Sequence, residues 1–228
     1  MMIVKFVAVV IIGYLLGSIP FGALIGRRAA KVDIREYGSG RTGTTNVLRV
    51  AGKKAAAVAV ILDVLKGALA VVFAGLLIGS GYIEVGGYGI GLLTAQSLAA
   101  LAAIAGHNWP VFLKFKGGRG VATFFGGLIA LCPVAAVFGG EVFITGAVLT
   151  RFASLGSIAG AIGAYAILLP LTIVSGFPAE YLVYTLIGTI TIIIMHRDNI
   201  ARLIAGKERK LGEKTPGKDP PSPGKSTG

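Results

Sequence analysis

The chain has 228 residues, of which 54% are hydrophobic and only 14% are charged, and its mean hydropathy is +0.81. An ordinary soluble domain carries about 25% charged residues, so this composition excludes a soluble fold and indicates helices that have lipid as their solvent. The formal net charge of +12 suits nucleic acid, anionic lipid or anionic substrates as partners. The single cysteine, Cys132, excludes an intrachain disulfide bond.

Apolar segments that can cross about 30 Å of hydrocarbon, which takes about 20 residues, follow one another along the chain. The clear ones cover residues 3–26, 55–79, 88–106 and 153–174, and a shorter one covers 181–195. The first has no clear cleavage site, so we expect a retained span rather than a signal peptide. The apolar stretch 120–150 is too long for one crossing, and Gly139-Gly140-Glu141 predicts a turn near its middle. We expect two short or tilted crossings there, with a re-entrant hairpin as the alternative.

The Lys and Arg residues gather on one side of these spans. They lie between the first two spans, before and after the 120–150 stretch, and after the last span, whereas the loops near Glu84, Glu141 and Glu180 have none. The positive-inside rule places the basic segments in the cytoplasm. This pattern predicts an all-α bundle of seven transmembrane helices with its N-terminus outside and its C-terminus in the cytoplasm.

The same charge distribution identifies the partners. The cations lie in short segments next to the membrane, so we expect lipid and anionic substrates rather than nucleic acid, and for many of these cations setting the topology is a sufficient role. We expect a single catalytic membrane domain over residues 1–213. The tail over 214–228 is charged and rich in Pro, Gly and Ser, which predicts disorder.

The segment 38–46 is glycine-rich and polar, and Arg49 follows it one turn later. Its glycines are Gly38, Gly40 and Gly43, its candidate hydroxyl donors are Ser39, Thr44 and Thr45, and Asn46 ends it. Glycines let backbone N–H groups approach an anion closely, and a helix that begins here would add its N-terminus. The spacing looks like a nucleotide P-loop, but Thr44 stands where that loop has Lys and no strand precedes it, which excludes an NTPase. A phosphate cradle and a flexible polar loop remain.

A second candidate anion site lies just before the 120–150 stretch. Lys116 and Arg119 flank the pair Gly117-Gly118, and Gly120 follows. Two cations, a flexible backbone and the N-terminus of the next helix together predict an anion-binding nest. The alternative is that these cations only set the topology.

A third group begins where the last span ends. At helical spacing His196 and Asn199 share a face, and Asn199 and Arg202 do so as well. This face would present a possible proton carrier, an amide and a guanidinium at the lipid boundary. The alternative is an ordinary structural histidine at the interface.

Charged residues inside a span are site candidates because charge is costly in hydrocarbon. Asp63 and Lys66 lie three residues apart in the second span and can neutralise each other; we interpret them as structural supports that orient the 38–46 loop. Arg151 and Ser154 lie at a cytoplasmic turn and could add to an anion site. The sequence shows no Cys/His cluster typical of a transition metal and no Ser-His-carboxylate set for a covalent acyl-enzyme.

In combination these segments resemble the bacterial membrane glycerol-3-phosphate acyltransferases that use acyl phosphate, the PlsY family. The resemblance covers nearly the whole chain before the tail, through residues 17–22, 38–49, 63–67, 106–123, 150–157 and 196–208. It implies seven membrane helices in the bacterial inner membrane, with the active site facing the cytoplasm. The implied substrates are glycerol 3-phosphate and acyl phosphate, and we expect a monomer without a cofactor.

The resemblance also assigns residues by position. The important Ser and Arg of the first segment fall on Ser39 and Arg49, the basic glycine-rich loop falls on 116–120, and the third segment supplies His196, Asn199 and Glu208. The sequence departs from the common pattern at four positions, which are Arg41 in place of Asn, Thr44 in place of Ala, Trp109 in place of Phe and Arg119 in place of Lys. The other glycerol-3-phosphate acyltransferases use His-x4-Asp, and neither His107 nor His196 has Asp five positions later.

These observations predict direct attack of the glycerol 1-hydroxyl on the acyl carbonyl, with phosphate leaving. The expected catalytic residues are Ser39, Arg49, Lys116, His196 and Asn199. The expected substrate-binding residues are Gly38, Gly40, Thr45, Asn46, Gly117, Gly118, Arg119, Gly120, Arg151 and Ser154, and the expected structural residues are Asp63, Lys66 and Glu208. The base is either His196 or a substrate phosphate oxygen. The alternative function is a membrane anion transporter, which would require polar residues through the membrane depth.

Overall fold

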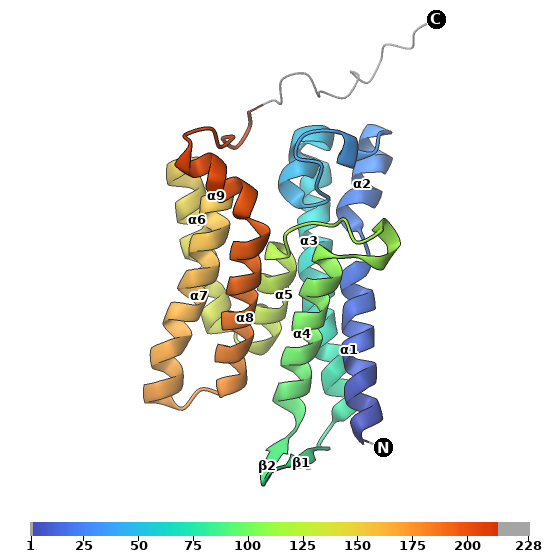
Figure 1. Cartoon of the computed structure of the whole chain (residues 1–228), viewed down its shortest axis with the longest axis vertical. Coiled ribbons are helices and arrows are strands. Elements are labelled where there is room, and N and C mark those ends of the chain that lie inside the picture. The colour runs from blue at the N-terminus through green and yellow to red at the C-terminus, as the bar shows by residue number, and fades with distance from the viewer. Residues whose placement is uncertain (1, 214–228) are drawn as a thin grey trace, which may run out of the picture.

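The computed structural model describes residues 2–213, so the expected disordered tail over 214–228 lies outside the described residues. The chain forms a bundle of long helices packed side by side (Figure 1). The helices are α1 (Met2–Ser18), α2 (Phe21–Ala30), α3 (Thr44–Ile78), α4 (Leu92–Asn108), α5 (Val121–Leu131), α6 (Pro133–Thr150), α7 (Ala153–Ser175), α8 (Ala179–Met195) and α9 (Arg197–Ile204), with short 3-10 turns at Ile34–Glu36 and Val111–Leu113.

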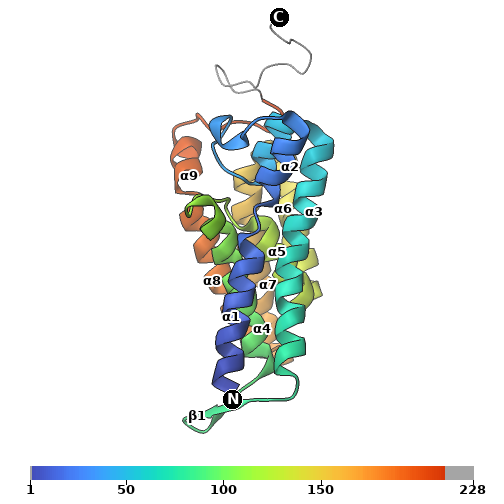
Figure 2. The same ribbon diagram turned by 90° about the vertical axis from the view of Figure 1, so that its right-hand side faces the viewer.

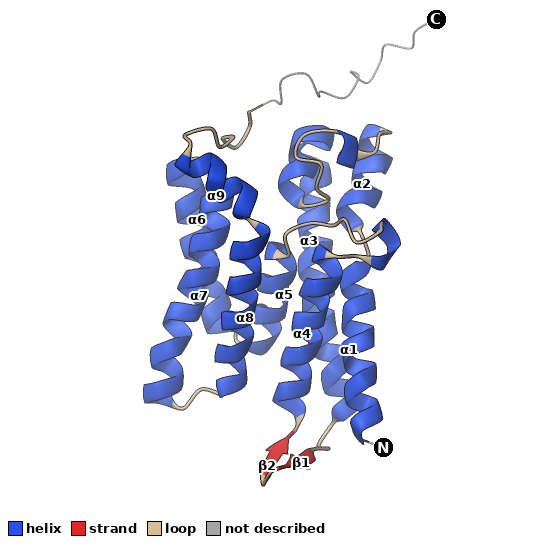
Figure 3. Ribbon diagram, in the orientation of Figure 1, coloured by secondary structure: helices blue, strands red, loops and turns tan. Residues whose placement is uncertain are grey.

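The N-terminus and the basic loops lie at opposite ends of the bundle. Between α3 and α4 the chain adds a small antiparallel hairpin of β1 (Ile83–Val85) and β2 (Tyr88–Ile90), a minor departure from the expected all-α class (Figure 3). Figure 2 shows this hairpin and the N-terminus at one end, with α2, α9 and the loops at the other. The end that carries the basic loops is therefore the end where the predicted phosphate sites meet.

The helices are those of an integral membrane protein. In the described part of the chain, four helical segments are long and apolar enough to cross a membrane, namely Met2–Ala30, Thr44–Ile78, Pro133–Thr150 and Ala153–Ser175. A fifth arises if α8 and α9, which are bent by 60° at their junction, form one span. Helix α5 is apolar but has only 11 residues, which is about 16 Å of helix. The number of seven crossings therefore stays a prediction.

The break in the apolar stretch 120–150 lies at Cys132, so the predicted turn at 139–141 is wrong. Pro133 opens α6, because its missing N–H and fixed φ suit the first position of a helix. A residue before proline is pushed into extended backbone, and Cys132 has φ −147° and ψ 87°. The pair Gly139-Gly140 lies inside α6, where its lack of side chains makes room rather than a turn.

Glycines allow the closest helix contacts. A Cβ at Gly13 or Gly17 of α1 would collide with the backbone of α4, and one at Gly156 or Gly160 of α7 would collide with α6. In lipid the hydrophobic effect does not drive helices together, so close van der Waals packing of this kind has to hold them. These contacts make the bundle a rigid frame for the loops at its basic end.

Candidate functional site

Two adjoining cavities lie at the basic end of the bundle, one polar and one apolar. The polar cavity has a volume of about 120 Å³ and the apolar one about 390 Å³. Both are lined by Ser39, Arg41, Thr45, Arg119, Ala153, Ser157 and His196. The polar cavity therefore continues into the apolar one across a shared boundary.

The polar cavity brings together the segments that the sequence singled out. Its further lining residues are Gly38, Arg49, Ser154, Asp198, Asn199, Arg202, Glu208 and Arg209. They come from the loop before α3, the start of α3, the start of α7, helix α9 and the segment after it. The segment 38–49 and the segment that begins at His196 therefore meet Arg119 at one end of the molecule.

The polar cavity is strongly cationic, and two of its guanidinium groups are not fully paired. The Nε atoms of Arg49 and Arg119 are buried and have no hydrogen-bond partner within residues 2–213. Burial, together with the nearby Arg41 and Arg202, lowers the pKa of Arg119 to about 10. Arg119 still carries its charge at neutral pH. A buried cation without a partner is costly, so this cavity is suited to an anion.

Glu208 orients one wall of the polar cavity. Its Oε1 accepts hydrogen bonds from Asn199 Nδ2 at 2.6 Å and Ser154 Oγ at 2.8 Å, and its Oε2 accepts from Arg202 Nε at 2.8 Å. Burial raises the pKa of Glu208, but these hydrogen bonds outweigh it and hold the pKa below its usual value. The carboxylate fixes the Asn199 amide so that its Oδ1, which has no partner in the described chain, remains available to a ligand.

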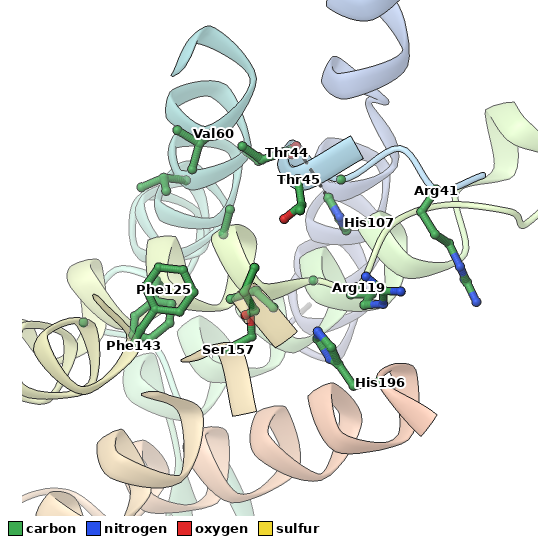
Figure 4. A pocket seen from close by; sticks show the side chains of 18 of the residues that line it. Arg41, Thr44, Thr45, Val60, His107, Arg119, Phe125, Phe143, Ser157 and His196 are labelled. Carbon is green, nitrogen blue, oxygen red and sulfur yellow. Dashed lines mark hydrogen bonds and ion pairs between the residues drawn. The ribbon is translucent and has the colours of Figure 1, made fainter. Parts of the chain in front are cut away.

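His196 follows α8 and borders both cavities. Its side chain is buried, and its Nδ1 lies 2.8 Å from the Ile192 carbonyl oxygen. A carbonyl can only accept, so the neutral ring carries its proton on Nδ1 and keeps a lone pair on Nε2. In Figure 4 the imidazole ring of His196 and the guanidinium group of Arg119 point toward each other. Burial and the nearby Arg119 lower the pKa of His196 to about 4, so the ring is neutral at pH 7, and a proton on Nε2 is held only weakly.

The 38–46 loop differs from the predicted backbone cradle. The N–H of Ser39 donates to Asn46 Oδ1 at 2.8 Å, and the N–H of Gly40 donates to Tyr37 O at 3.0 Å, so neither is free for phosphate. Asn46 Nδ2 donates in turn to the carbonyls of Ile34 at 2.8 Å and Arg41 at 2.9 Å. Asn46 therefore supports the loop, and its expected role as a substrate ligand stays a prediction. The loop offers side chains to the cavity instead.

The Gly117-Gly118 pair also differs from expectation. The N–H of Gly117 donates to Asn108 O at 3.1 Å, and that of Gly118 donates to His107 O at 3.0 Å. A Cβ at either glycine would collide with His107. These glycines let the loop pack onto the end of α4, and their bonded N–H groups do not form the predicted anion nest.

The remaining predicted ligands divide between the cavities and the surface. Gly120, with φ +79°, precedes α5 and lines the apolar cavity. The side chains of Lys116 and Arg151 are exposed, and neither residue borders a cavity described above. The carbonyl of Arg151 accepts from Leu211 N at 2.7 Å, which ties down the segment after α9. No described contact supports the predicted catalytic role of Lys116, so we expect it to contribute less to turnover than Arg119.

A buried ion cluster stands beside the site. Lys66 Nζ lies 2.8 Å from Asp63 Oδ1, as their spacing predicts, and donates to Ile19 O at 3.1 Å in the break between α1 and α2. Asp63 Oδ1 also lies 3.5 Å from His107 Nδ1, a partner that the sequence did not indicate. Asp63 and His107 both border the apolar cavity, so the cluster fastens α3 and α4 at its rim.

The apolar cavity was missed by reasoning from the sequence, because apolar residues of membrane helices give no signal that separates a cavity from a packed face. Its apolar lining includes Val60, Val64, Phe125, Ile129, Ala136, Gly140, Phe143 and Ile144, from α3, α5 and α6. In Figure 4 Phe125 and Phe143 lie together, away from Arg119 and His196. Arg41, Ser157 and Arg209 were also not identified as cavity residues.

Comparisons with known proteins identify a family and a fold that this chain resembles. A family model described as glycerol-3-phosphate acyltransferase matches residues 7–206. The glycerol-3-phosphate acyltransferase 3 of Dehalococcoides mccartyi (strain CBDB1) is 66% identical over 94% of this chain and 99% of its own. The glycerol-3-phosphate acyltransferase of Halalkalibacterium halodurans is 42% identical over 90% and 95%. The crystal structure of PlsY, an integral membrane glycerol 3-phosphate acyltransferase, in its glycerol 3-phosphate form has a TM-score of 0.78 and 36% identity over 91% of this chain and 96% of that one.

Proposed function

The chain belongs to the glycerol-3-phosphate acyltransferase family of integral membrane proteins, and we propose that its acyl donor is acyl phosphate. The reaction would form an ester between the acyl group and the 1-hydroxyl of sn-glycerol 3-phosphate and release lysophosphatidic acid and inorganic phosphate. We further propose a seven-helix bundle with the N-terminus outside, in which α5 and α6 form the re-entrant hairpin that the sequence offered as the alternative to two full crossings. We also propose a monomer in the bacterial inner membrane whose active site faces the cytoplasm.

One observation carries the choice of donor, which is the junction of a cationic cavity with an apolar one. Acyl phosphate has a dianionic head and a long apolar tail, and the two cavities match these parts in order. The polar cavity also collects five cations, Arg41, Arg49, Arg119, Arg202 and Arg209, against two carboxylates, Asp198 and Glu208. The three positive charges in excess are more than a single phosphate dianion needs. Guanidinium groups bind phosphate by charge-assisted hydrogen bonds, so the cavity suits two phosphorylated reactants side by side.

The proposed chemistry needs positioning more than activation. Acyl phosphate is a mixed anhydride, so its carbonyl is already reactive and phosphate is a good leaving group. Arg119 and Ser39, at the boundary of the cavities, would hold the acyl phosphate, and Arg49 with Asn199 would hold glycerol 3-phosphate. Fixing the two reactants together lowers the entropy cost of the step, and the cations offset the charge on the leaving phosphate.

The proton of the attacking hydroxyl needs an acceptor. As the new C–O bond forms and the C–O bond to phosphate breaks, the proton moves either to Nε2 of His196 or to an oxygen of a substrate phosphate. Because Nδ1 of His196 donates to the Ile192 carbonyl oxygen, the lone pair that could accept this proton is on Nε2. The anion-transporter alternative would require a polar path through the membrane, whereas the polar cavity here continues into apolar walls.

The donor is tested with the purified, folded protein in lipid. Glycerol 3-phosphate is supplied with palmitoyl phosphate, palmitoyl-CoA or palmitoyl acyl carrier protein in turn, and lysophosphatidic acid and inorganic phosphate are measured. We expect equal amounts of both products with palmitoyl phosphate and at least about 100-fold slower turnover with the other donors, whose acyl carbonyl is bonded to sulfur and not to the phosphate that the cations would hold. Turnover with palmitoyl-CoA but not with palmitoyl phosphate would contradict the proposal.

A further inference from the structure

We propose that Gly140, on the wall of the apolar cavity, sets how long an acyl chain the protein accepts. This inference rests on the proposed function, because it takes the occupant of the apolar cavity to be the acyl chain of the donor. Gly140 lies inside α6 and borders the cavity. Its missing side chain leaves a space that a longer chain can enter.

Gly140 is unlike the packing glycines of the bundle. A Cβ at its neighbour Gly139 would come within 2.7 Å of both Ala164 Cβ and Gly160 O on α7, so Gly139 is required for helix contact. A Cβ at Gly140 would have no atom of the described chain within 4 Å. Helix packing therefore gives no reason for glycine at this position.

Backbone conformation gives no reason either. Gly140 is not among the glycines with positive φ, and it lies in the interior of a regular helix, where glycine is the least favourable residue apart from proline. A larger apolar residue would suit the helix better. What glycine does provide here is open volume on the cavity side of α6.

The position of Gly140 along α6 determines which part of the chain it would meet. Helix α6 runs from Pro133 to Thr150, next to the start of α7 where Ser157 borders the polar cavity. Gly146 of α6 packs against Gly156 beside Ser157, and Gly140 lies six residues before Gly146, which is about 9 Å of helix. Ala136 and Ile144, one turn to either side, border the cavity too. An acyl phosphate whose phosphate lies in the polar cavity reaches Gly140 only with the distal carbons of its acyl chain.

The test is a series of side chains of increasing size, Gly140→Ala, Gly140→Leu and Gly140→Phe. Each purified variant is assayed with acyl phosphates from octanoyl to stearoyl, and kcat/KM is plotted against chain length. Each methylene kept out of the cavity should cost about fourfold. A leucine that displaces about three methylenes should lower kcat/KM for stearoyl phosphate about 60-fold, and leave octanoyl phosphate within about twofold of the wild type.

Val148→Leu is the matched control, because Val148 lies on the same helix, is exposed and does not border the cavity. It should leave the whole profile unchanged. An unchanged profile in Gly140→Leu, or an equal loss at every chain length, would overturn the inference while the wild-type protein remains active. Failure of the wild type to turn over any acyl phosphate would instead contradict the proposed function, so the two failures are distinguishable.

Discussion

At the scale of single residues, two cations three positions apart have different surroundings. Arg119 is largely buried and borders both cavities, whereas the side chain of Lys116 is exposed and the residue borders neither. The sequence presents them as equal members of one basic loop. The difference arises because Gly117 and Gly118 pack the loop onto the end of α4, which turns Arg119 inward.

We therefore expect Arg119→Ala to lower kcat/KM for acyl transfer by about 100-fold or more, because it removes a cation from the anion site. Arg119→Lys keeps the charge and should lose less than about tenfold. Lys116→Ala should stay within about fivefold of the wild type. These values come from initial rates in lipid with palmitoyl phosphate and glycerol 3-phosphate. A loss in Lys116→Ala as large as that in Arg119→Ala would place Lys116 in the working site.

The residue types in the sequence predicted which chemical groups line the site, but they did not predict which polar atoms are free to bind a ligand. Ser39, Arg49, His196 and Asn199 all border the polar cavity, in agreement with the pattern of hydroxyl, cation, imidazole and amide groups. The sequence could not show that the Asn46 amide is consumed within the loop. Whether a polar atom is free depends on tertiary hydrogen bonds, and residue type alone does not specify them.

At the scale of elements, glycine in a membrane helix gave a misleading signal. The spans were predictable because an apolar run of sufficient length has no other stable form in lipid. The break inside 120–150 was assigned to Gly139-Gly140, but Pro133 begins the new helix. Proline favours the first position of a helix, as at Pro133, although Pro170 lies inside α7 without ending it. Glycine in lipid serves close packing and open space.

One side chain, Asn46, holds the loop before α3. Variants can therefore distinguish a residue that supports the loop from one that takes part in the reaction. Asn46→Ala would leave the carbonyls of Ile34 and Arg41 and the N–H of Ser39 without their partner. We expect it to lower the free energy of unfolding by about 2–3 kcal/mol and to lower activity as well. Thermal unfolding in detergent and initial rates measure the two effects.

Ser39→Ala is the contrasting variant, because it keeps the backbone N–H that bonds Asn46 and removes only a hydroxyl at the cavities. It should lower activity at least about tenfold and leave the melting temperature within about 2 °C of the wild type. If Asn46→Ala melts like the wild type, Asn46 is not the support of the loop.

At the scale of the whole molecule, the distribution of charge agrees with the arrangement of the helices. The basic loops and both cavities lie at one end, and the hairpin and the N-terminus lie at the other (Figure 1). The positive-inside rule and the grouping of phosphate ligands therefore point to the same face. The depth of the α5–α6 turn was not predictable, because hydropathy detects apolar runs and does not locate where a short helix stops.

Cysteine labelling tests both the orientation and this depth. In a Cys132→Ala background, single cysteines replace the exposed residues Glu84 in the hairpin, Lys210 after α9, and Val134 beside the α5–α6 turn. A membrane-impermeant maleimide should label the Glu84→Cys variant in intact cells and the Lys210→Cys variant only after permeabilisation, since the positive-inside rule predicts that the basic end faces the cytoplasm. Labelling at 210 in intact cells would contradict the orientation.

The third cysteine determines whether α5 crosses the membrane. Its 11 residues span about 16 Å, roughly half of the hydrocarbon thickness, so the turn at Cys132 should lie within the hydrocarbon. A cysteine at 134 should therefore react with a membrane-permeant maleimide after detergent solubilisation but not with the impermeant reagent from either side. Labelling at 134 from outside in intact cells would show that α5 and α6 make two full crossings, because only then would the turn reach water.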